Sequence, residues 1–322
     1  MPLPFGLGQR LPLVMYKKKK NNTTLKVQVT GTLLPFLMEK MSTSRTSAKG
    51  LLSRRVVMVN GSVQTRHDMP LNVGDEVMIV AAKGNTELRH PKLRIVYEDS
   101  DLIVVEKKVG LLTAPVNKVS SEATALGILK AYVRHQDPKG GVYVVHRLDR
   151  ETSGLLVFAK SQELQEYMRT YWADLVRARV YVSIIEGVPE KKEDTITTWF
   201  TEDEQHAMVY SSPVDDGGKK AVTHYKVLSS VVPEDAKGYS MVELRLETGR
   251  TNQIRVHMAS IGHPVVGDRK YGHGNEQSPM DRLALHATEL AFVHPVSEQV
   301  VKFTSPIPRE FLALCKRSRS HE

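Results

Sequence analysis

The sequence predicts an α+β fold, and three observations support this prediction. Short apolar runs rich in β-branched or aromatic residues, such as Val142–Val145 and Leu155–Ala159, have the length of buried strands. Residues 241–246 alternate apolar and polar side chains, which is the period of a strand with one buried face. In residues 161–175, apolar side chains instead recur every three or four positions, as in an amphipathic helix.

The composition indicates a soluble globular protein that is long enough for two domains. The chain has 322 residues, of which 41% are hydrophobic and 25% are charged. No apolar run approaches the ~20 residues that cross a bilayer, and Met1–Met15 lacks the charged start of a signal peptide. The single cysteine, Cys315, forms no intrachain disulfide and indicates a reducing compartment. We therefore expect a cytoplasmic protein without a membrane partner.

The net charge of +9 indicates a polyanionic partner, for which nucleic acid is the first choice. Charge alone does not decide this, because many soluble proteins are basic. The basic residues are also clustered, at Lys17–Lys20, Arg54-Arg55, Arg177 and Arg179, Lys219-Lys220 and Lys316–Arg319.

Shifts in composition divide the chain into five segments. They are an irregular basic arm at 1–24, a compact unit at 25–80, a polar linker at 81–91, a large domain at 92–315 and a basic tail at 316–322. Prolines, glycines and runs of like charge predict that the arm, the linker and the tail are irregular.

In the unit 25–80 the pattern predicts a strand, two helices and a hairpin. Alternating apolar residues indicate a strand at 25–29. Thr32 and Ser44 can each accept hydrogen bonds from the first free amides of a following helix. Asn60-Gly61 accepts the positive φ angles of a tight hairpin turn, and a turn and a closing strand follow at 73–79.

The most informative stretch of the large domain is the charged loop His146–Gly154 between two predicted core strands. A polar loop held at both ends by buried strands is a rigidly mounted site. Its central carboxylate, Asp149, stands between Arg147 and Arg150, so we expect it to stay ionised and to accept hydrogen bonds. That charge suits a nucleophile or an electrostatic stabiliser better than a general acid. A structural aspartate in a salt-bridged turn would give the same local pattern.

After this loop the pattern predicts a helix that starts at Ser161, followed by a strand at 177–187 that contains Tyr181. The polar, glycine-containing residues 189–221 predict a hairpin excursion, and strands follow at 222–228 and 241–246.

Residues 246–262 predict a strand, a turn and a helix, with Thr251 as the helix cap and Gly262 at its end. Arg250 and Arg255 lie near the N-terminus of this helix, where backbone amides and the helix dipole favour an anion.

The loop His146–Leu156 resembles the signature loop of the RluA-type RNA pseudouridine synthases. Segments at 95–107, 246–257 and 282–287 resemble the same family, in the same order along the chain. The resemblance departs at two positions. Lys108 stands where proline is usual, and Asn252 stands where histidine is usual.

This resemblance implies that Asp149 is the catalytic residue for the isomerisation of uridine to pseudouridine in RNA. It also implies that Tyr181 stacks on the target base, that Arg255 pairs with Asp149 and that Leu285 forms an apolar wall. Arg147 is placed to fill the space vacated by the base or to grip a phosphate. The implied RNA contacts of this domain are Arg147, Arg150, Arg250 and Leu285. Without the resemblance, Tyr181 and Leu285 would be interpreted as core residues.

The unit 25–80 resembles an S4 RNA-binding domain in its two short helices and basic hairpin. The matching residues are Ser44-Arg45, Val59–Gly61 and Val73–Val77. The resemblance implies contacts with RNA phosphates from Arg45, Lys49, Arg54 and Arg55. The alternative interpretation of these residues is a solvated basic face.

Together the two resemblances imply an S4-like α/β domain followed by a catalytic domain with a mixed, mainly antiparallel sheet flanked by helices. The expected partner is structured RNA, with large-subunit ribosomal RNA favoured over tRNA by analogy of layout, and the expected state is a monomer. The twelve histidines show no metal-ligand spacing, and no glycine-rich loop opens a helix. We therefore expect neither a metal nor a nucleotide cofactor.

Two other functions remain compatible with the sequence. A non-catalytic RNA-binding protein would explain the charge and the S4-like unit, and dependence of an RNA change on Asp149 would distinguish it. A retaining hydrolase would use Asp149 and Glu151 as paired carboxylates, although two residues this close in a loop need not converge. Release of free uracil would support the hydrolase.

Overall fold

The computed structural model describes residues 23–53, 55–79, 88–115, 122–203, 205–232, 238–272 and 278–316. Several predictions concern residues outside these ranges, namely the arm up to residue 22, Arg54, linker residues 81–87 and tail residues 317–322.

The N-terminal unit contains two helices that pack on short strands. Its elements are β1 (Thr23–Lys26), β2 (Gly31–Thr32), α1 (Leu33–Lys40), α2 (Arg45–Ser53), β3 (Val57–Val59), β4 (Ser62–Val63), β5 (Pro70–Leu71) and β6 (Glu76–Ile79). Leu33, Leu37 and Val57 are buried between the helices and the strands. The Ser44 hydroxyl accepts a hydrogen bond from Ser47 N (3.2 Å), which confirms the predicted cap. Asn60-Gly61 turns the β3–β4 hairpin with φ angles of 49° and 75°, also as predicted.

Three details of this unit differ from the prediction. The strand predicted at 25–29 is β1 at Thr23–Lys26, and Val29 beyond it is exposed. Thr23 pairs with Ile79 of β6, so the irregular arm cannot extend to residue 24. Thr32 precedes α1, but its side chain makes no cap hydrogen bond. The first amides of α1 instead donate to backbone carbonyls of the segment 67–69, because this segment passes the helix N-terminus.

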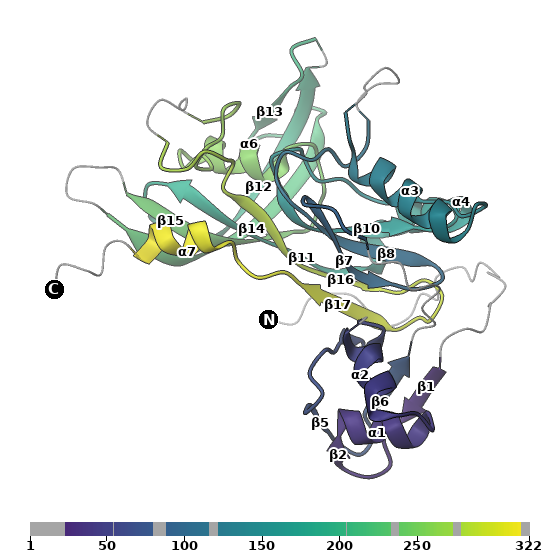
Figure 1. Cartoon of the computed structure of the whole chain (residues 1–322). Helices are drawn as coiled ribbons and strands as arrows, with labels where there is room; N and C mark the ends of the chain where they lie inside the picture. The colour runs from purple at the N-terminus through teal and green to yellow at the C-terminus, as the bar shows by residue number, and fades with distance from the viewer. Residues whose placement is uncertain are drawn as a thin grey trace.

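The C-terminal domain is built on one large, strongly curved sheet (Figure 1). Its strands are β7 (Leu93–Glu98), β8 (Leu102–Lys107), β9 (Tyr143–Val144), β10 (Ser153–Ala159), β11 (Val176–Glu186), β12 (Glu193–Asp203), β13 (Met208–Ser212), β14 (Lys219–Val231), β15 (Tyr239–Leu246), β16 (Leu285–Val293) and β17 (Val300–Thr304). Its helices are α3 (Ala125–Gln136), α4 (Gln162–Thr170), α5 (Trp172–Leu175), α6 (Gln253–Ser260) and α7 (Arg309–Lys316).

The strand order confirms a mixed, mainly antiparallel sheet. The sequence of neighbours is β17-β16-β11-β15-β14-β12-β13, and β10 joins β16 on one side and β8 on the other. Within this domain the β10–β16 pair is parallel, and the other paired strands are antiparallel among the described residues. Alternate residues of β8 and β10 enter different core clusters, so α3 and α4 cover opposite faces of these strands. In the described part of the chain, no helix is both long and apolar enough to span a membrane.

The predicted helix 161–175 is two helices. Ser161 caps α4 as expected, since its hydroxyl accepts from Leu164 N (3.2 Å). At Tyr171 the backbone leaves the helical region (φ −104°, ψ 21°), and the short helix α5 starts in a new direction. Met168 and Leu175 are nevertheless both buried. The apolar spacing therefore predicted which side chains are buried but not the break between them.

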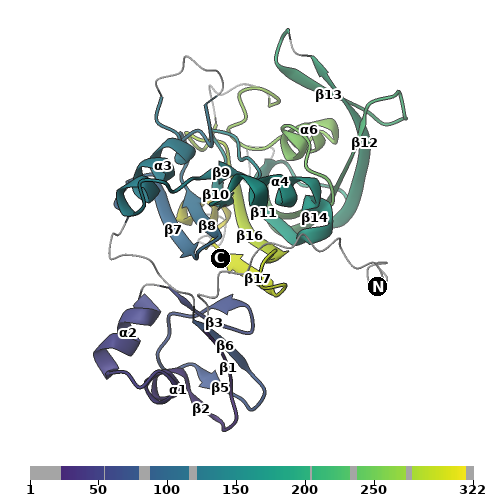
Figure 2. The ribbon, with the colours of Figure 1, turned by 90° about the vertical axis from the view of Figure 1, so that its right-hand side faces the viewer.

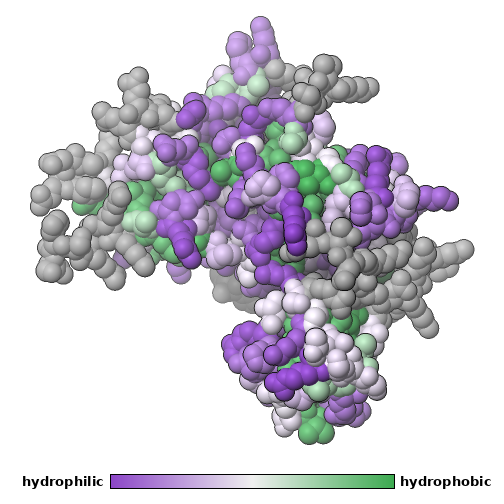
Figure 3. Space-filling view, in the orientation of Figure 1, coloured by the Kyte–Doolittle hydropathy of each residue, from purple (hydrophilic) through white to green (hydrophobic). Residues whose placement is uncertain are grey.

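The two units join edge to edge. β4 pairs in parallel with β17, with Ser62 opposite Lys302, and Lys302 N donates to Gly61 O (3.3 Å). Side chains of both units, among them Met58 and Phe303, share one core cluster. Figures 1 and 2 show the N-terminal unit standing against the end of β17, and Figure 3 shows it as a separate lobe of the surface. The strands therefore form a single path from β1 to β13.

Candidate active site

A cleft of about 930 Å³ opens on the C-terminal domain. Its walls come from the segment 144–149, helices α4 and α5, strand β11, the segment 246–255 and the first residue of β16. Six of the predicted residues line this cleft, namely Arg147, Asp149, Tyr181, Arg250, Arg255 and Leu285. Segments far apart in the sequence thus place the predicted catalytic group, its cation and its apolar wall around one space.

The backbone on each side of Asp149 is held by a buried side chain. The Thr113 hydroxyl donates to Leu148 O (2.7 Å) and accepts from Leu148 N (3.2 Å). On the other side, Lys107 Nζ donates to Arg150 O (3.2 Å). Because both neighbours are fixed, the Asp149 side chain leaves the loop in a defined direction.

Lys107 is a fully buried cation beneath the loop. Its ammonium also donates to Leu111 O (2.9 Å). Burial lowers the pKa of Lys107 to about 8, while the negative charges of Asp149 and Glu151 act in the opposite direction. Lys107 therefore contributes both hydrogen bonds to the loop and a positive field behind the Asp149 carboxylate.

Arg255 divides its guanidinium between two carboxylates. Nε and Nη2 donate to the two oxygens of Asp268, each at 2.7 Å. Nη1 lies 3.6 Å from Asp149 Oδ2. The Asp268 side chain is fully buried, whereas that of Asp149 is 41% exposed. The structure therefore places Arg255 beside Asp149, as the sequence implied, and adds Asp268 as the group that orients it.

The contacts between Arg255 and Asp268 keep the Asp268 carboxylate ionised. Burial alone would raise the pKa of Asp268, but the hydrogen bonds and charge of Arg255 hold that pKa below its ordinary value. Asn252 also helps to fix the guanidinium, because its Oδ1 accepts from Arg255 Nη1 (3.2 Å). An asparagine at this position thus retains a direct contact with Arg255.

Tyr181 lies on β11 and packs against two clusters of the hydrophobic core. Burial raises the pKa of its hydroxyl, while the charge of Arg179 acts in the opposite direction. Tyr181 is therefore a neutral phenol at pH 7, which can donate a hydrogen bond. Leu285, only 4% exposed, adds an apolar surface to the cleft.

His146, the first residue of the loop, is a structural residue. Its ring stacks on Trp172 with centroids 5.0 Å apart, and its Nε2 accepts from Val157 N (3.3 Å). Burial lowers the pKa of His146 to about 3, with a smaller contribution from Arg179. This histidine is thus neutral and cannot serve as a general acid at pH 7.

The turn before α6 is held by the buried side chain of Gln253. Gln253 Oε1 accepts from Thr248 Oγ1 (2.8 Å) and Arg250 N (2.9 Å), and Nε2 donates to Val222 O (2.9 Å). These bonds fix the position of Arg250 at the cleft.

The predicted cap of α6 was wrong by one residue. Asn252, not Thr251, is the N-cap, and it adopts a left-handed conformation (φ 53°). Thr251 instead donates to Glu202 of β12 (3.3 Å). The predicted end of the helix is correct, since Gly262 follows α6 with φ 80°.

Other predicted residues lie outside the cleft. Arg150 is exposed and forms an ion pair with Glu122. Glu151 is exposed and does not line the cleft, so the two carboxylates of the hydrolase alternative do not face one space. Arg45 and Lys49 are exposed on α2 in the N-terminal unit. Arg55, in contrast, is partly buried at the junction of the two units, near the charges of Arg94 and Glu106, and burial lowers its pKa.

Five residues that line or support the cleft were not predicted from the sequence, namely Lys107, Thr113, Arg179, Gln253 and Asp268. Lys107 ends the strand β8 beside Glu106 and Lys108, so the local pattern did not single it out as a buried cation. Nothing in the local pattern distinguishes Thr113 or Asp268, because their partners are distant in the sequence.

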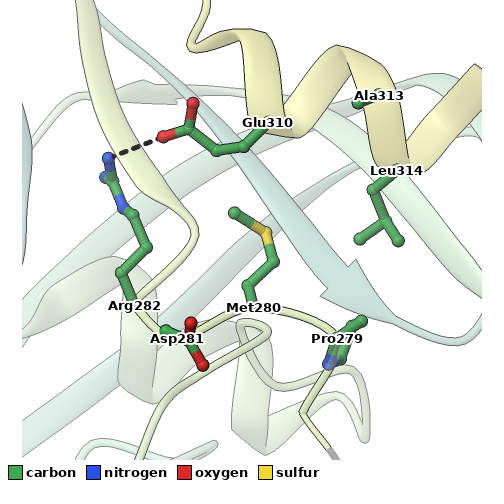
Figure 4. A pocket seen from close by; sticks show the side chains of 7 residues that line it. All are labelled: Pro279, Met280, Asp281, Arg282, Glu310, Ala313 and Leu314. Atoms are coloured by element: carbon green, nitrogen blue, oxygen red, sulfur yellow. Dashed lines mark hydrogen bonds and ion pairs between the residues drawn. The ribbon is translucent and has the colours of Figure 1, made fainter.

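A second pocket, of about 360 Å³, lies between the segment 279–282 and α7 (Figure 4). Two of its charged residues, Arg282 and Glu310, form an ion pair with Nη1 and Oε1 3.3 Å apart. Arg282 Nη2 also donates to Ser153 Oγ at the start of β10 (2.8 Å). Arg282 therefore links α7 to the sheet through these two contacts. The residues that line this pocket do not include those predicted to be catalytic.

Comparisons with known proteins agree with this geometry. A sequence model of the family described as RNA pseudouridylate synthase matches residues 101–260. An uncharacterised RNA pseudouridine synthase of Bacillus subtilis is 32% identical over 88% of this chain and 92% of that protein. The ribosomal large subunit pseudouridine synthase D of Haemophilus ducreyi is 30% identical over 90% of this chain and 93% of that protein.

A solved structure shares the same fold. Human RNA pseudouridylate synthase domain containing 1 aligns with a TM-score of 0.53 and 26% identity, over 66% of this chain and 83% of that one. The chain therefore belongs to the RNA pseudouridine synthase family. It is an RNA pseudouridine synthase, the class of enzyme that the signature loop implied.

Proposed function

We propose that this enzyme isomerises specific uridines of structured RNA, with large-subunit ribosomal RNA as the substrate, and that Asp149 is its catalytic residue. One observation carries the proposal. Asp149, Tyr181, Arg255 and Leu285 come from four distant segments and line the same cleft. Several relatives carry the name ribosomal large subunit pseudouridine synthase D, which favours ribosomal RNA over tRNA and a cytoplasmic site of action.

The cleft is suited to a base that has left its RNA helix. Extrusion of a stacked base costs a few kcal/mol, which contacts in the pocket offset. The Tyr181 ring supplies a stacking surface and Leu285 an apolar one. Arg147 is exposed at the rim, where it can occupy the vacated space or contact a phosphate.

The reaction exchanges one glycosidic bond for another and consumes no external reagent. The N1–C1′ bond of uridine breaks, the base turns, and C5 bonds to C1′. The proton on C5 is then lost and N1 gains one. The Asp149 carboxylate assists cleavage either by attack on C1′ or by removal of the C2′ proton, while Arg255 and Lys107 stabilise its charge.

The N-terminal unit would hold the RNA away from the reacting base. We propose that it acts as an S4-like domain in which Arg45 and Lys49 on α2 contact phosphates. Both side chains are exposed, and neither forms an ion pair with an acidic residue within the described part of the chain. Phosphate contacts of this kind fix orientation and carry no sequence information.

Replacement of Asp149 tests the catalytic assignment. Asp149→Asn removes the charge and keeps the shape, so we expect no pseudouridine to form while RNA binding stays within about twofold of wild type. Pseudouridine is measured in ribosomal RNA from three kinds of cells: those with the wild-type protein, those with Asp149→Asn and those that lack the protein. Normal turnover by Asp149→Asn would contradict the role of this residue.

Deuterium at C2′ of the target uridine distinguishes the two chemical routes. Removal of the C2′ proton predicts a primary isotope effect on single-turnover rates, and direct attack on C1′ predicts none of that size.

A further inference from the structure

Arg179 is a half-buried cation in the cleft without a carboxylate partner. It lines the cleft on β11, two residues before Tyr181. Nη2 donates to Glu247 O and Thr248 O, both at 3.0 Å. These contacts are with neutral carbonyl groups, and no ion pair to Arg179 occurs among the described residues. Its positive charge is therefore not neutralised within the part of the chain that the structure describes.

Two of its nitrogen atoms, Nε and Nη1, make no hydrogen bond within the described residues. Nε is buried without a hydrogen-bond partner, and all the hydrogen bonds of Arg179 within the described residues come from Nη2. Nη1 instead lies against Gly249, where an added Cβ would come within 2.5 Å of it. The backbone at Gly249 thus leaves room for the guanidinium, which is fixed in place with donors to spare.

An unpaired cation in such a position is unfavourable for the free enzyme. Burial lowers the pKa of Arg179, and Tyr181, a neutral phenol at pH 7, supplies no negative charge to offset it. A guanidinium remains protonated at pH 7 in any case. A cation that loses its hydration without gaining a counter-ion costs free energy. Buried cations of this kind are found at sites where an anionic ligand supplies the negative charge. Exposed arginines of the cleft, such as Arg147, need no counter-ion because water solvates their charge.

We propose that Arg179 binds a backbone phosphate of the RNA next to the target uridine. Residues two apart on a strand lie about 7 Å from each other, so a base stacked on Tyr181 brings its adjoining phosphate towards Arg179. A uracil carbonyl is the other acceptor in reach, but it is neutral and leaves the charge uncompensated. A phosphate supplies the charge and accepts a charge-assisted hydrogen bond from the guanidinium. This inference rests on the proposed RNA substrate.

Neutralisation of single phosphates tests the contact. The probe is a synthetic RNA stem–loop with one uridine in its loop, and methylphosphonate replaces each phosphate beside that uridine in turn. Binding is measured in the inactive Asp149→Asn background, so that turnover does not interfere. We expect one of the replacements to weaken binding about tenfold in this parent and less than twofold after Arg179→Gln is added. An equal loss in both backgrounds, or no loss in the parent, would overturn the proposal.

Two further variants separate phosphate binding from a structural role. Arg177→Gln removes the same charge from the same strand at an exposed position outside the cleft, so it should leave the methylphosphonate effect intact. Gly249→Ala keeps the charge but displaces Nη1, and should reduce the methylphosphonate effect as Arg179→Gln does. A full effect in Gly249→Ala would count against the contact, provided that the melting temperatures match.

Kinetics on the active enzyme give an independent result. Loss of a phosphate contact that is equal in the ground and transition states raises KM and leaves kcat unchanged. We expect this pattern for Arg179→Lys, whose ammonium keeps the charge but cannot reach both the carbonyls and the phosphate. If the wild-type chain formed no pseudouridine, the proposed function would fail, while the binding cycle would still stand on its own result.

Discussion

The guanidinium of Arg255 joins a buried carboxylate to the predicted catalytic one. Its two bonds to Asp268 are short and charge-assisted, and the Asp268 side chain also accepts from Lys270 N (2.9 Å) and Tyr271 N (3.0 Å). With four hydrogen bonds to its carboxylate, Asp268 is satisfied although it is buried. Arg255 is therefore oriented before substrate arrives, and its Nη1 is directed at Asp149.

Replacement of Asp268 should disturb the site without touching the reacting atoms. In Asp268→Asn the charge of Arg255 loses its buried partner, so we expect a loss of about 3 kcal/mol in the free energy of unfolding. We also expect a fall of ~100-fold in single-turnover rate, because Arg255 no longer holds its place beside Asp149.

The matched control is Glu310→Gln, which breaks an arginine ion pair whose carboxylate is half exposed and outside the cleft. That change should leave the single-turnover rate near wild type. Equal rates for Asp268→Asn and Glu310→Gln would show that Asp268 does not position Arg255 for the reaction.

Among the elements, β7, the turn before β8 and the end of β16 are tied by one buried polar cluster. Asp99 Oδ2 accepts from Tyr97 OH (2.7 Å) and from His294 Nε2 (2.8 Å). Asp99 Oδ1 accepts from the amides of Asp101 and Leu102. Burial alone would raise the pKa of Asp99, but the charge and hydrogen bond of His294 lower it to about 2. The cluster is therefore stable only while Asp99 is ionised.

This cluster predicts a pH dependence of stability. A carboxylate whose pKa is lowered on folding stabilises the fold fully above its ordinary pKa of 3.8, and the contribution is lost as the pH falls towards about 2. The loss amounts to about 2 kcal/mol for wild type. Urea unfolding across this range should show it, and Asp99→Asn should remove it. The exposed Asp281→Asn should keep the wild-type profile.

At the same scale, the sequence predicted the elements better than their ends. Local patterns correctly predicted the hairpin at Asn60-Gly61 and the cap at Ser161, because turn and cap chemistry depends on adjacent residues. They failed at Tyr171, where the backbone leaves the helical region, and at Thr251, whose hydroxyl donates to Glu202 of β12. At Thr251 a tertiary contact overrides the local preference.

For the whole molecule, the junction of the two units depends on one glycine. A Cβ at Gly61 would lie 1.9 Å from the carbonyl oxygen of Val300, and φ is 75°. No sequence pattern indicated this contact, since Ser62 and its partner Lys302 are far apart in the chain. The same holds for the candidate site. Motifs named Asp149 and its loop, but the supporting contacts from Thr113 and other distant segments needed the fold.

Alanine at Gly61 should separate the two units. We expect Gly61→Ala to lose about 1–2 kcal/mol for the left-handed conformation and more for the collision with Val300. Hydrogen exchange at the Lys302 amide, which donates to Gly61 O, should rise accordingly.

Gly74→Ala is the control for this prediction. It carries the same kind of backbone strain (φ 94°) but has open space around its Cβ. In Gly74→Ala, the Lys302 amide should exchange its hydrogen at the wild-type rate. If the two variants exchanged alike, backbone strain rather than the close approach would explain the effect.

The edge-to-edge join also sets a limit on substrates. Because β4 pairs with β17 in one sheet, the sheet connects the unit that carries α2 with the domain that carries the cleft. This connection sets the distance between α2 and the cleft. An RNA that touches both must present its uridine at one distance from the part that α2 grips. With the proposed contact between α2 and RNA, a uridine is selected by its distance from that contact, with no need for contacts to the neighbouring bases.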